Sequence, residues 1–558
     1  MSIYLSNSNK GTSNLKPKQH NKHMVNVNLD ALIPREDFEV LEATKPNTVR
    51  TTISVRDLQK GDFFFESIRK PDFQRETNEW NINRIVELVR SFINGDLIPA
   101  IILWQSNSKY IFVIDGSHRL SALAAWINDD YGDGEISKTF YGLDISEEQI
   151  RIADKTRTII KNSVGQFKDY QFASANPDKL PKYATKAKAL GSLAVQLQWV
   201  SGNSYSAEQS FFKINQSATP INTTELKLLE ERNAPNCIAS RAIIRSGAGH
   251  KYWSKFEESK QRKIEDTAKN ISRVLFRPPL HQPIKTLDLP IGGELYASQT
   301  LPLILGFVNI VNGIDETQTN AKRIGEILEE QKIKTPEQIA QELENASVTT
   351  ITYLDKCSII AQKINSSNSI SLGLHPAVYF YSQNGRYKTA SFYAITALMM
   401  ELNDKTKIGN FLKIRENFER ILIDYDYLIQ QIGRKYRSAI NGYLYIKEFY
   451  LELISRLLTN NKTTDQIIDA ILIDKKYSYL KKSINPVVTE GKDFSVETKS
   501  TAFITETLKN APKCKLCHGY IHVNSITFDH IKRKEDDGKG DVENAQLAHP
   551  YCNTTYKN

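Results

Sequence analysis

The C-terminal end of the chain carries C-K-L-C at residues 514–517, F-D-H-I at residues 528–531 and H-P-Y-C-N at residues 549–553. A Cys-x-x-Cys pair followed by a His-x-x-Cys pair has the ligand types and the spacing that suit one tetrahedral zinc ion. Because four protein ligands leave no open coordination position, this pattern predicts a structural zinc site. Its expected ligands are Cys514, Cys517, His549 and Cys552.

An Asp-His pair lies between the two ligand pairs, in a run of β-branched and aromatic residues that predicts a strand. Asp529 and His530 are adjacent, so their side chains point to opposite faces of that strand. Hydrolysis of a phosphodiester requires an activated water molecule and a cation near the leaving oxygen. Histidine is the side chain best suited to act as a general base near neutral pH. The pair therefore predicts a hydrolytic site beside the zinc.

In this order, these residues resemble the HNH nuclease module, which has a ββα-metal fold. The resemblance implies that Asp529 and Asn553 bind a catalytic Mg²⁺ or Mn²⁺ ion and that His530 is the general base. It also implies that Asn544 holds the histidine backbone or ring in place. His549 stands where the family more usually has a cysteine, and histidine is also a good zinc ligand. A zinc ribbon without activity is the alternative that the zinc spacing alone leaves open.

Length and composition describe an ordinary globular protein with a weak preference for polyanions. The 558 residues predict two to four domains, and the formal charge of +9 favours a nucleic acid over an acidic protein surface. The chain has no apolar run of membrane-spanning length and no signal-peptide pattern at its N-terminus, so we expect no membrane partner. Three of the five cysteines belong to the zinc set, which fits a reducing cytoplasm.

The residues at both ends of one segment in the N-terminal third predict a helix. Asn81 is an N-cap residue, apolar residues at helical spacing continue to Phe92, and Gly95 predicts the end of the helix. The apolar runs at residues 98–104 and 110–114 then each predict a buried strand.

The second strand leads directly into D-G-S-H-R at residues 115–119, which predicts an anion-binding turn. The free N–H groups at a helix N-terminus, following a strand and a glycine, favour negative charge. Gly116 permits close approach of the backbone, and Arg119 suits a phosphate contact. A structural turn with an Arg119 ion pair explains the motif equally well. The candidate phosphate site consists of Asp115, Gly116, Ser117, His118 and Arg119.

Three motifs together resemble the ParB/sulfiredoxin-like N-terminal domain of GmrSD-type modification-dependent restriction proteins, over residues 53–232. They are P-D-F-Q-R at residues 71–75, the D-G-S-H-R motif and F-F-K-I-N at residues 211–215. The family usually carries D-G-Q-Q-R, so Ser117 and His118 occupy its two glutamine positions. The resemblance implies a site that senses a nucleotide or DNA, that also includes Gln74 and Arg75, and that has NTPase activity in the family.

The predicted fold class is an α+β multidomain protein. We expect a basic tail at residues 1–45, an α/β sensing domain at 46–235, a helical domain at 236–482, a linker at 483–510 and the nuclease at 511–558. Two basic-aromatic clusters in the helical domain, one around Trp253 and one around Tyr379, predict core packing more strongly than base stacking.

The sequence as a whole predicts a cytoplasmic, metal-dependent DNA endonuclease of a bacterial anti-phage defence system. We expect structural Zn²⁺, catalytic Mg²⁺ or Mn²⁺, and an NTP as cofactors. The expected partners are DNA, in particular modified phage DNA, a nucleotide and a second copy of the chain. Two alternatives stay open: a mobile-element or repair HNH nuclease without nucleotide use, and a non-catalytic zinc-containing DNA-binding regulator.

Overall fold

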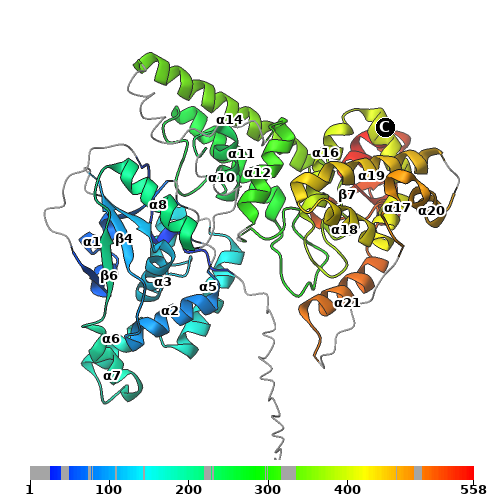
Figure 1. The fold of residues 1–558 in the computed structure, drawn as a ribbon. Coiled ribbons are helices and arrows are strands. Elements are labelled where there is room, and N and C mark those ends of the chain that lie inside the picture. The colour runs from blue at the N-terminus through cyan, green and yellow to red at the C-terminus, as the bar shows by residue number, and fades with distance from the viewer. Residues whose placement is uncertain are drawn as a thin grey trace, which may run out of the picture.

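The computed structural model of the chain describes residues 26–38, 50–72, 74, 77, 80–106, 110–141, 145–218, 228, 231–295, 297, 299–315, 335–459, 462–482 and 493–557. Figure 1 shows an α/β part in blue and cyan on one side and green helices in the centre. Yellow and orange helices, together with the red C-terminal module, lie on the other side. Within the described ranges, no helix has the length and apolar character to cross a membrane.

The N-terminal part is built on a six-stranded mixed sheet. In spatial order its strands are β1 (Arg35–Glu36), β3 (Ile68–Pro71), β5 (Ile111–Asp115), β4 (Ile101–Gln105), β6 (Ala194–Trp199) and β2 (Thr52–Ser54). The neighbours β3 and β5 are parallel. Parallel strands end at the same edge of a sheet, so the two sequence motifs that follow β3 and β5 lie side by side.

The predicted helix and the two predicted strands are confirmed. Helix α2 begins after Asn81, whose side chain accepts a hydrogen bond from the Arg84 backbone, and ends at Gly95 with φ of 76°. Its buried face continues the core of the sheet. The other helices of this part are α1 (Phe63–Ser67), α3 (Ser117–Asn128), α4 (Glu135–Tyr141), α5 (Glu147–Ser163), α6 (Phe167–Ala175), α7 (Pro181–Leu190) and α8 (Ser204–Ala218); α2 spans Ile82–Asn94.

The expected tail is wrong for residues 26–38, which belong to the N-terminal core. Val27 and Leu32 are fully buried. The buried carboxylate of Asp30 accepts hydrogen bonds from the Lys70 ammonium at 2.7 Å and from the Thr77 backbone at 3.0 Å. Asn and Asp between the apolar residues suggest a solvated tail, yet here they alternate with core positions and are paired. The rest of the expected tail, residues 1–25 and 39–45, lies outside the described residues.

The second half of the chain is helical, as predicted, and the aromatic residues at the centre of the two predicted basic-aromatic clusters are buried. Trp253 and Tyr379 are fully inaccessible to solvent, which confirms that they pack in the core. The helices are α10 (Pro235–Ile244), α11 (Glu258–Phe276), α12 (Thr300–Asn312), α14 (Pro336–Ile364), α15 (Pro376–Tyr379), α16 (Thr389–Glu401), α17 (Lys405–Asp424), α18 (Asp426–Lys435), α19 (Ala439–Thr459) and α20 (Thr464–Ile473).

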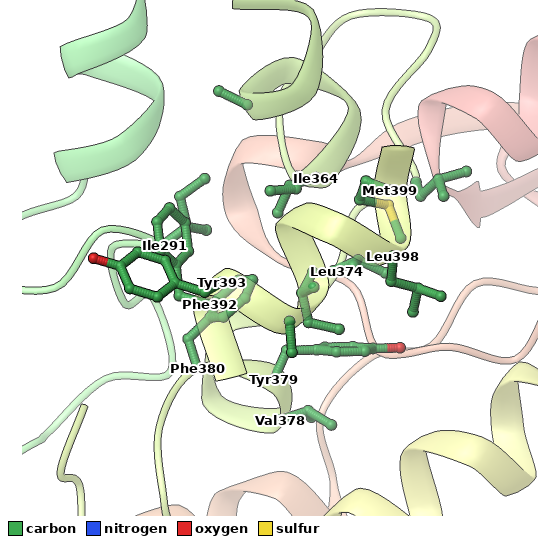
Figure 2. Close-up of a cluster of buried hydrophobic side chains, with 14 of the residues drawn as sticks. Ile291, Ile364, Leu374, Val378, Tyr379, Phe380, Phe392, Tyr393, Leu398 and Met399 are labelled. Carbon is green, nitrogen blue, oxygen red and sulfur yellow. The ribbon is translucent and has the colours of Figure 1, made fainter. Parts of the chain in front are cut away.

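One hydrophobic core joins these helices to the C-terminal module. It extends from Ile238 in α10 to Cys552 at the end of the chain. Figure 2 shows part of it, where Leu374, Tyr379 and Phe392 lie among the helices. The helical part and the module therefore share a core, although the sequence suggests two separate domains.

The expected linker is wrong in its second half, which is a helix. Helix α21 (Val496–Lys509) is capped by the Ser495 side chain and buries Ile504 and Leu508. These two apolar residues are four positions apart, so they lie on one helical face. Residues 483–492 of the expected linker lie outside the described residues.

Candidate metal and nuclease site

The four predicted zinc ligands come together at the C-terminus, and all four are buried. Their ligand atoms lie within 4.8 Å of one another, which fits a single tetrahedral zinc ion. Hydrogen bonds with Cys517 and Cys552 hold the pKa of the Cys514 thiol well below its usual range, so a thiolate is favoured there. The expected cluster is confirmed as a group of residues that could hold zinc.

His549 is oriented by the backbone of the first knuckle. Its Nε2 lies 3.0 Å from the Tyr520 carbonyl oxygen, and its Nδ1 lies 3.3 Å from Cys517 Sγ. A carbonyl can only accept a hydrogen bond, so Nε2 carries the proton and Nδ1 faces the cysteines. This is the usual way in which a backbone carbonyl fixes the tautomer of a zinc-binding histidine.

A buried ion pair of the helical part lies directly against the cluster. Arg415 of α17 is fully buried, and its Nη1 is 3.3 Å from His549 Nδ1 and 3.8 Å from Cys517 Sγ. Its Nε donates to Glu419 at 2.7 Å, and Glu419 accepts a second hydrogen bond from the Tyr520 backbone. Three thiolates and Zn²⁺ sum to one negative charge, which the Arg415 guanidinium offsets. Sequence reasoning missed this residue, although an Arg and a Glu four apart on an apolar helix face are a signal.

Two glycines permit this close packing. A Cβ atom at Gly373 would lie 2.3 Å from Cδ2 of His549, and one at Gly519 would lie 2.2 Å from Nε of Arg415. Both distances are shorter than any real carbon contact, so the helical part and the zinc cluster fit only with glycine at these positions.

The predicted Asp-His pair lies on a two-stranded hairpin. Strand β7 (Thr527–His530) is antiparallel to β8 (Ala545–Ala548), and Asp529 lies opposite Gln546. Asp529 is buried and accepts hydrogen bonds from the Gln546 amide at 2.7 Å and from the Lys557 ammonium. His530 faces the other side of the strand and is partly exposed.

Two asparagines hold the hairpin from either end. Asn544 accepts a hydrogen bond from the Lys532 backbone at 2.7 Å and donates to the Lys532 and Lys539 carbonyls. It therefore fixes the loop that follows the histidine. Asn553 lies in the π-helical turn Cys552–Tyr556 and donates to the Phe528 carbonyl at 3.2 Å. The Asp529 carboxylate and an amide oxygen of Asn553 are the oxygen ligands that Mg²⁺ prefers.

The D-G-S-H-R turn has the predicted strand-turn-helix form. Gly116 ends β5 with φ of 95°, and α3 begins at Ser117, which is buried. Arg119 forms an ion pair with Asp115 at 2.7 Å and donates to the Ala100 carbonyl. His118 stacks on Trp80 with ring centroids 5.9 Å apart. An ion pair of Arg119 is also what we expect if the motif is only a structural turn and binds no phosphate.

The P-D-F-Q-R motif lies at the same sheet edge and is attached to the helical part. The Oε1 atom of Gln74 is buried and has no hydrogen-bond partner among the described residues. Asp72 forms a buried ion pair with Arg232 at 2.7 Å, and its carbonyl accepts from the Tyr252 hydroxyl. Sequence reasoning missed the Asp72–Arg232 pair. Arg75 lies outside the described residues, as do the side chain of Asn215 and residues 219–227.

A cavity of about 630 Å³, which is the size of a small-molecule pocket, lies where the three parts meet. The start of α5, the residues around α11 and the module residues Val523 and Asn524 line it. On this wall, burial and the negative charge of Glu294 raise the pKa of Glu148 to about 7.

Comparison with known families identifies both ends of the chain. Residues 55–230 match the model of the GmrSD restriction endonuclease N-terminal domain, and residues 514–558 match that of the HNH endonuclease. No curated protein and no solved structure matches the chain. The two resemblances drawn from sequence motifs are therefore confirmed.

Proposed function

The chain combines a GmrSD-type N-terminal domain with an HNH DNA endonuclease domain, and from this premise we propose that it cuts modified phage DNA in the cytoplasm. The single observation that carries the cutting role is the hairpin with Asp529 and His530, which belongs to the same module as the buried Cys₃His cluster. A divalent cation bound at Asp529 and Asn553 would stabilise the charge on the phosphate and on the departing 3′ oxygen.

His530 is the proposed general base in this mechanism. Its ring lies on the partly exposed face of β7, where a water molecule and a phosphate can approach. It accepts the proton of the attacking water, which is a contribution of about 10²–10⁴ in rate when the base is well positioned. Asn544 holds the loop after the histidine by hydrogen bonds to Lys532, and so keeps the strand end in place. The products carry 5′ phosphate and 3′ hydroxyl ends.

The test is conversion of supercoiled plasmid to nicked and linear forms by the purified full chain. His530→Ala and Asp529→Ala should lose cleavage while keeping zinc and fold. His518→Ala is the matched control, because His518 is an exposed histidine in the same module and is not a zinc ligand. Cleavage by His530→Ala at the wild-type rate, or cleavage that survives full chelation of divalent ions, would show that the mechanism is wrong.

The N-terminal domain is the proposed sensor of a nucleotide or of modified DNA. The turn at Gly116 presents backbone N–H groups at the start of α3. The buried Gln74 Oε1, which has no partner among the described residues, can accept a hydrogen bond from a ligand. The hydrogen bond from the Tyr252 hydroxyl to the Asp72 carbonyl links this edge to the helical part and offers a route for the signal. Cleavage of modified and of unmodified phage DNA, with and without each NTP, tests the sensing role.

A second candidate function is an HNH nuclease that uses no nucleotide. The Arg119–Asp115 ion pair favours it, because the guanidinium is already held by protein groups. The two candidates differ in one measurement, which is the binding of radiolabelled NTP to the purified chain. Binding that Arg119→Ala abolishes supports the sensor, whereas no binding of any NTP supports the second candidate.

A further inference from the structure

Several large apolar side chains of the nuclease module are exposed to solvent. The exposed fractions are 70% for Phe528, 56% for Ile531 and 87% for Val542. Single exposed apolar residues are normal on a protein surface, but a group of them in one short segment marks an interaction site. Phe528 lies on strand β7, and Ile531 and Val542 lie in the segment that joins β7 to β8.

The register of the hairpin places Phe528 beside the proposed base. Phe528 lies opposite Leu547 and His530 lies opposite Ala545, so both aromatic side chains are on one face of the hairpin. Asp529 is on the other face, where Gln546 and Lys557 contact it. Residues two apart on a strand are about 7 Å apart. The Phe528 ring is therefore exposed about 7 Å from the histidine.

We propose that Phe528 is a DNA-contacting residue whose ring packs against a base or a sugar next to the cut. The inference rests on the proposed function, since it takes His530 as the base. One DNA strand advances about 3.4 Å per nucleotide, so Phe528 reaches about two nucleotides from the phosphate at His530. A DNA strand that follows β7 from the histidine toward Phe528 would cover the phenylalanine.

The loop that follows the histidine does not provide a strong alternative source of binding. The loop after the histidine contains four cations, Lys532, Arg533, Lys534 and Lys539, and five acids, Glu535, Asp536, Asp537, Asp541 and Glu543. Because the acids outnumber the cations by one, the loop as a whole has no net positive charge that would attract DNA. Stacking of aromatic rings on bases does not depend on the net charge of the protein surface, and it tolerates any base sequence in the DNA.

DNA is the proposed occupant rather than a second copy of the chain. A protein seated over Phe528 would also cover His530, which lies on the same face, and would exclude the substrate. The two occupants predict different results, because loss of a protein contact changes the oligomeric state and loss of a DNA contact does not.

The experiment measures the affinity of the full chain for a short DNA duplex over a range of salt concentrations. All variants carry His530→Ala, so that DNA is bound but not cut. Adding Phe528→Ala should weaken binding by about tenfold. Its plot of log affinity against log salt concentration should have the same slope as that of the His530→Ala parent. Adding Lys532→Ala should instead reduce the slope by about one. Phe528→Trp should restore the binding.

Phe494→Ala is the matched control, because Phe494 is 74% exposed and lies outside the module. Phe528→Ala should melt at the wild-type temperature, since its ring makes little contact in the fold. Affinity equal to that of the Phe494 variant, or a change in oligomeric state without a loss of affinity, would overturn the proposal. Plasmid cleavage by the wild-type chain is measured in parallel. An inactive wild type contradicts the proposed function, whereas active wild type with no Phe528 effect contradicts this inference alone.

Discussion

The ammonium group of Lys557 lies 2.9 and 2.8 Å from the two carboxylate oxygens of Asp529. It also donates to the His530 carbonyl. Both side chains are largely shielded from solvent, at 17% and 6% exposed. Lys557 is four residues after Asn553, so both project from the same side of the terminal helical turns toward the hairpin. A protein cation thus contacts the carboxylate that we propose binds the catalytic ion.

The first prediction is that Lys557→Met lowers the Mg²⁺ concentration needed for half-maximal cleavage. A divalent ion at Asp529 must displace or repel the ammonium, and methionine keeps the aliphatic packing without the charge. We expect a shift of about tenfold, or ~1.4 kcal/mol. Titration calorimetry with Mn²⁺ measures the same shift without cleavage. Lys515→Met, at an exposed lysine of the same module, should change neither value; an unchanged or higher metal requirement in Lys557→Met contradicts the prediction.

The second prediction concerns Arg415, whose guanidinium contacts both the zinc ligands and Glu419. Arg415→Met leaves the Glu419 charge and the thiolates buried without their counter-charge. Breaking such a pair costs about 3–5 kcal/mol. Urea denaturation should show this loss of unfolding free energy together with weaker retention of zinc against a chelator. Arg420→Ala, at an exposed position of the same helix, should be nearly neutral. Equal stability of the two variants would show that Arg415 is not a structural partner of the cluster.

The third prediction is that loss of zinc destabilises the helical part as well as the module. The zinc cysteines belong to the same core as α10 to α21, and small metal sites supply folding free energy through the metal. Cys514→Ser, or removal of zinc by a strong chelator, should expose sites between residues 336 and 473 to proteases. Cys237→Ser, at a buried cysteine of a separate small cluster, is the control. A helical part that stays protease-resistant without zinc would contradict the shared core.

Local chemistry made part of this structure predictable. The cap at Asn81, the stop at Gly95 and the turn at Gly116 each depend on a few neighbouring residues, and all three are where the sequence places them. The zinc ligands follow from two short spacings. These features need no knowledge of which distant segments meet.

Long-range pairs were not predictable in this way. Arg415 and His549 are 134 residues apart, and Asp72 and Arg232 are 160 apart. The sequence around each of these residues shows a charged side chain among apolar ones, but it does not indicate which distant residue contacts that charge. The same reason explains residues 26–38, because the buried Asp30 is paired with cations from other segments, among them Lys70 and Arg245. Tertiary contacts, and not the local sequence, determine whether these residues are buried and which residues they contact.

The fourth prediction separates the two readings of Arg119. Its ion pair with Asp115 is partly exposed, at 20% and 32%, so it contributes at most about 1 kcal/mol to stability. Arg119→Ala should therefore melt within a few degrees of the wild type. If the turn binds phosphate, the same variant should lose most nucleotide or DNA affinity, measured by filter binding. A marked fall in melting temperature without any change in binding would favour the purely structural role.

The fifth prediction is a pH dependence of stability at the cavity between the three parts. Burial first, and then the nearby Glu294 charge, raise the pKa of Glu148 to about 7, and Arg151 opposes the shift. In an unfolded chain a glutamate titrates near 4.3. The folded state therefore holds the proton more tightly. The contribution to the unfolding free energy is fully present below about pH 4.3 and is lost as the pH rises to about 7.

Glu148→Gln mimics the protonated side chain and should remove this dependence. At pH 4 the variant and the wild type should unfold alike, and at pH 8 the variant should be more stable by about 1–3 kcal/mol. Urea denaturation at each pH measures the difference, and Glu147→Gln is the control, because Glu147 is the exposed neighbour at the start of the same helix. A difference between Glu148→Gln and the wild type that stays constant from pH 4 to pH 8 would show that Glu148 keeps an ordinary carboxylate in the folded state.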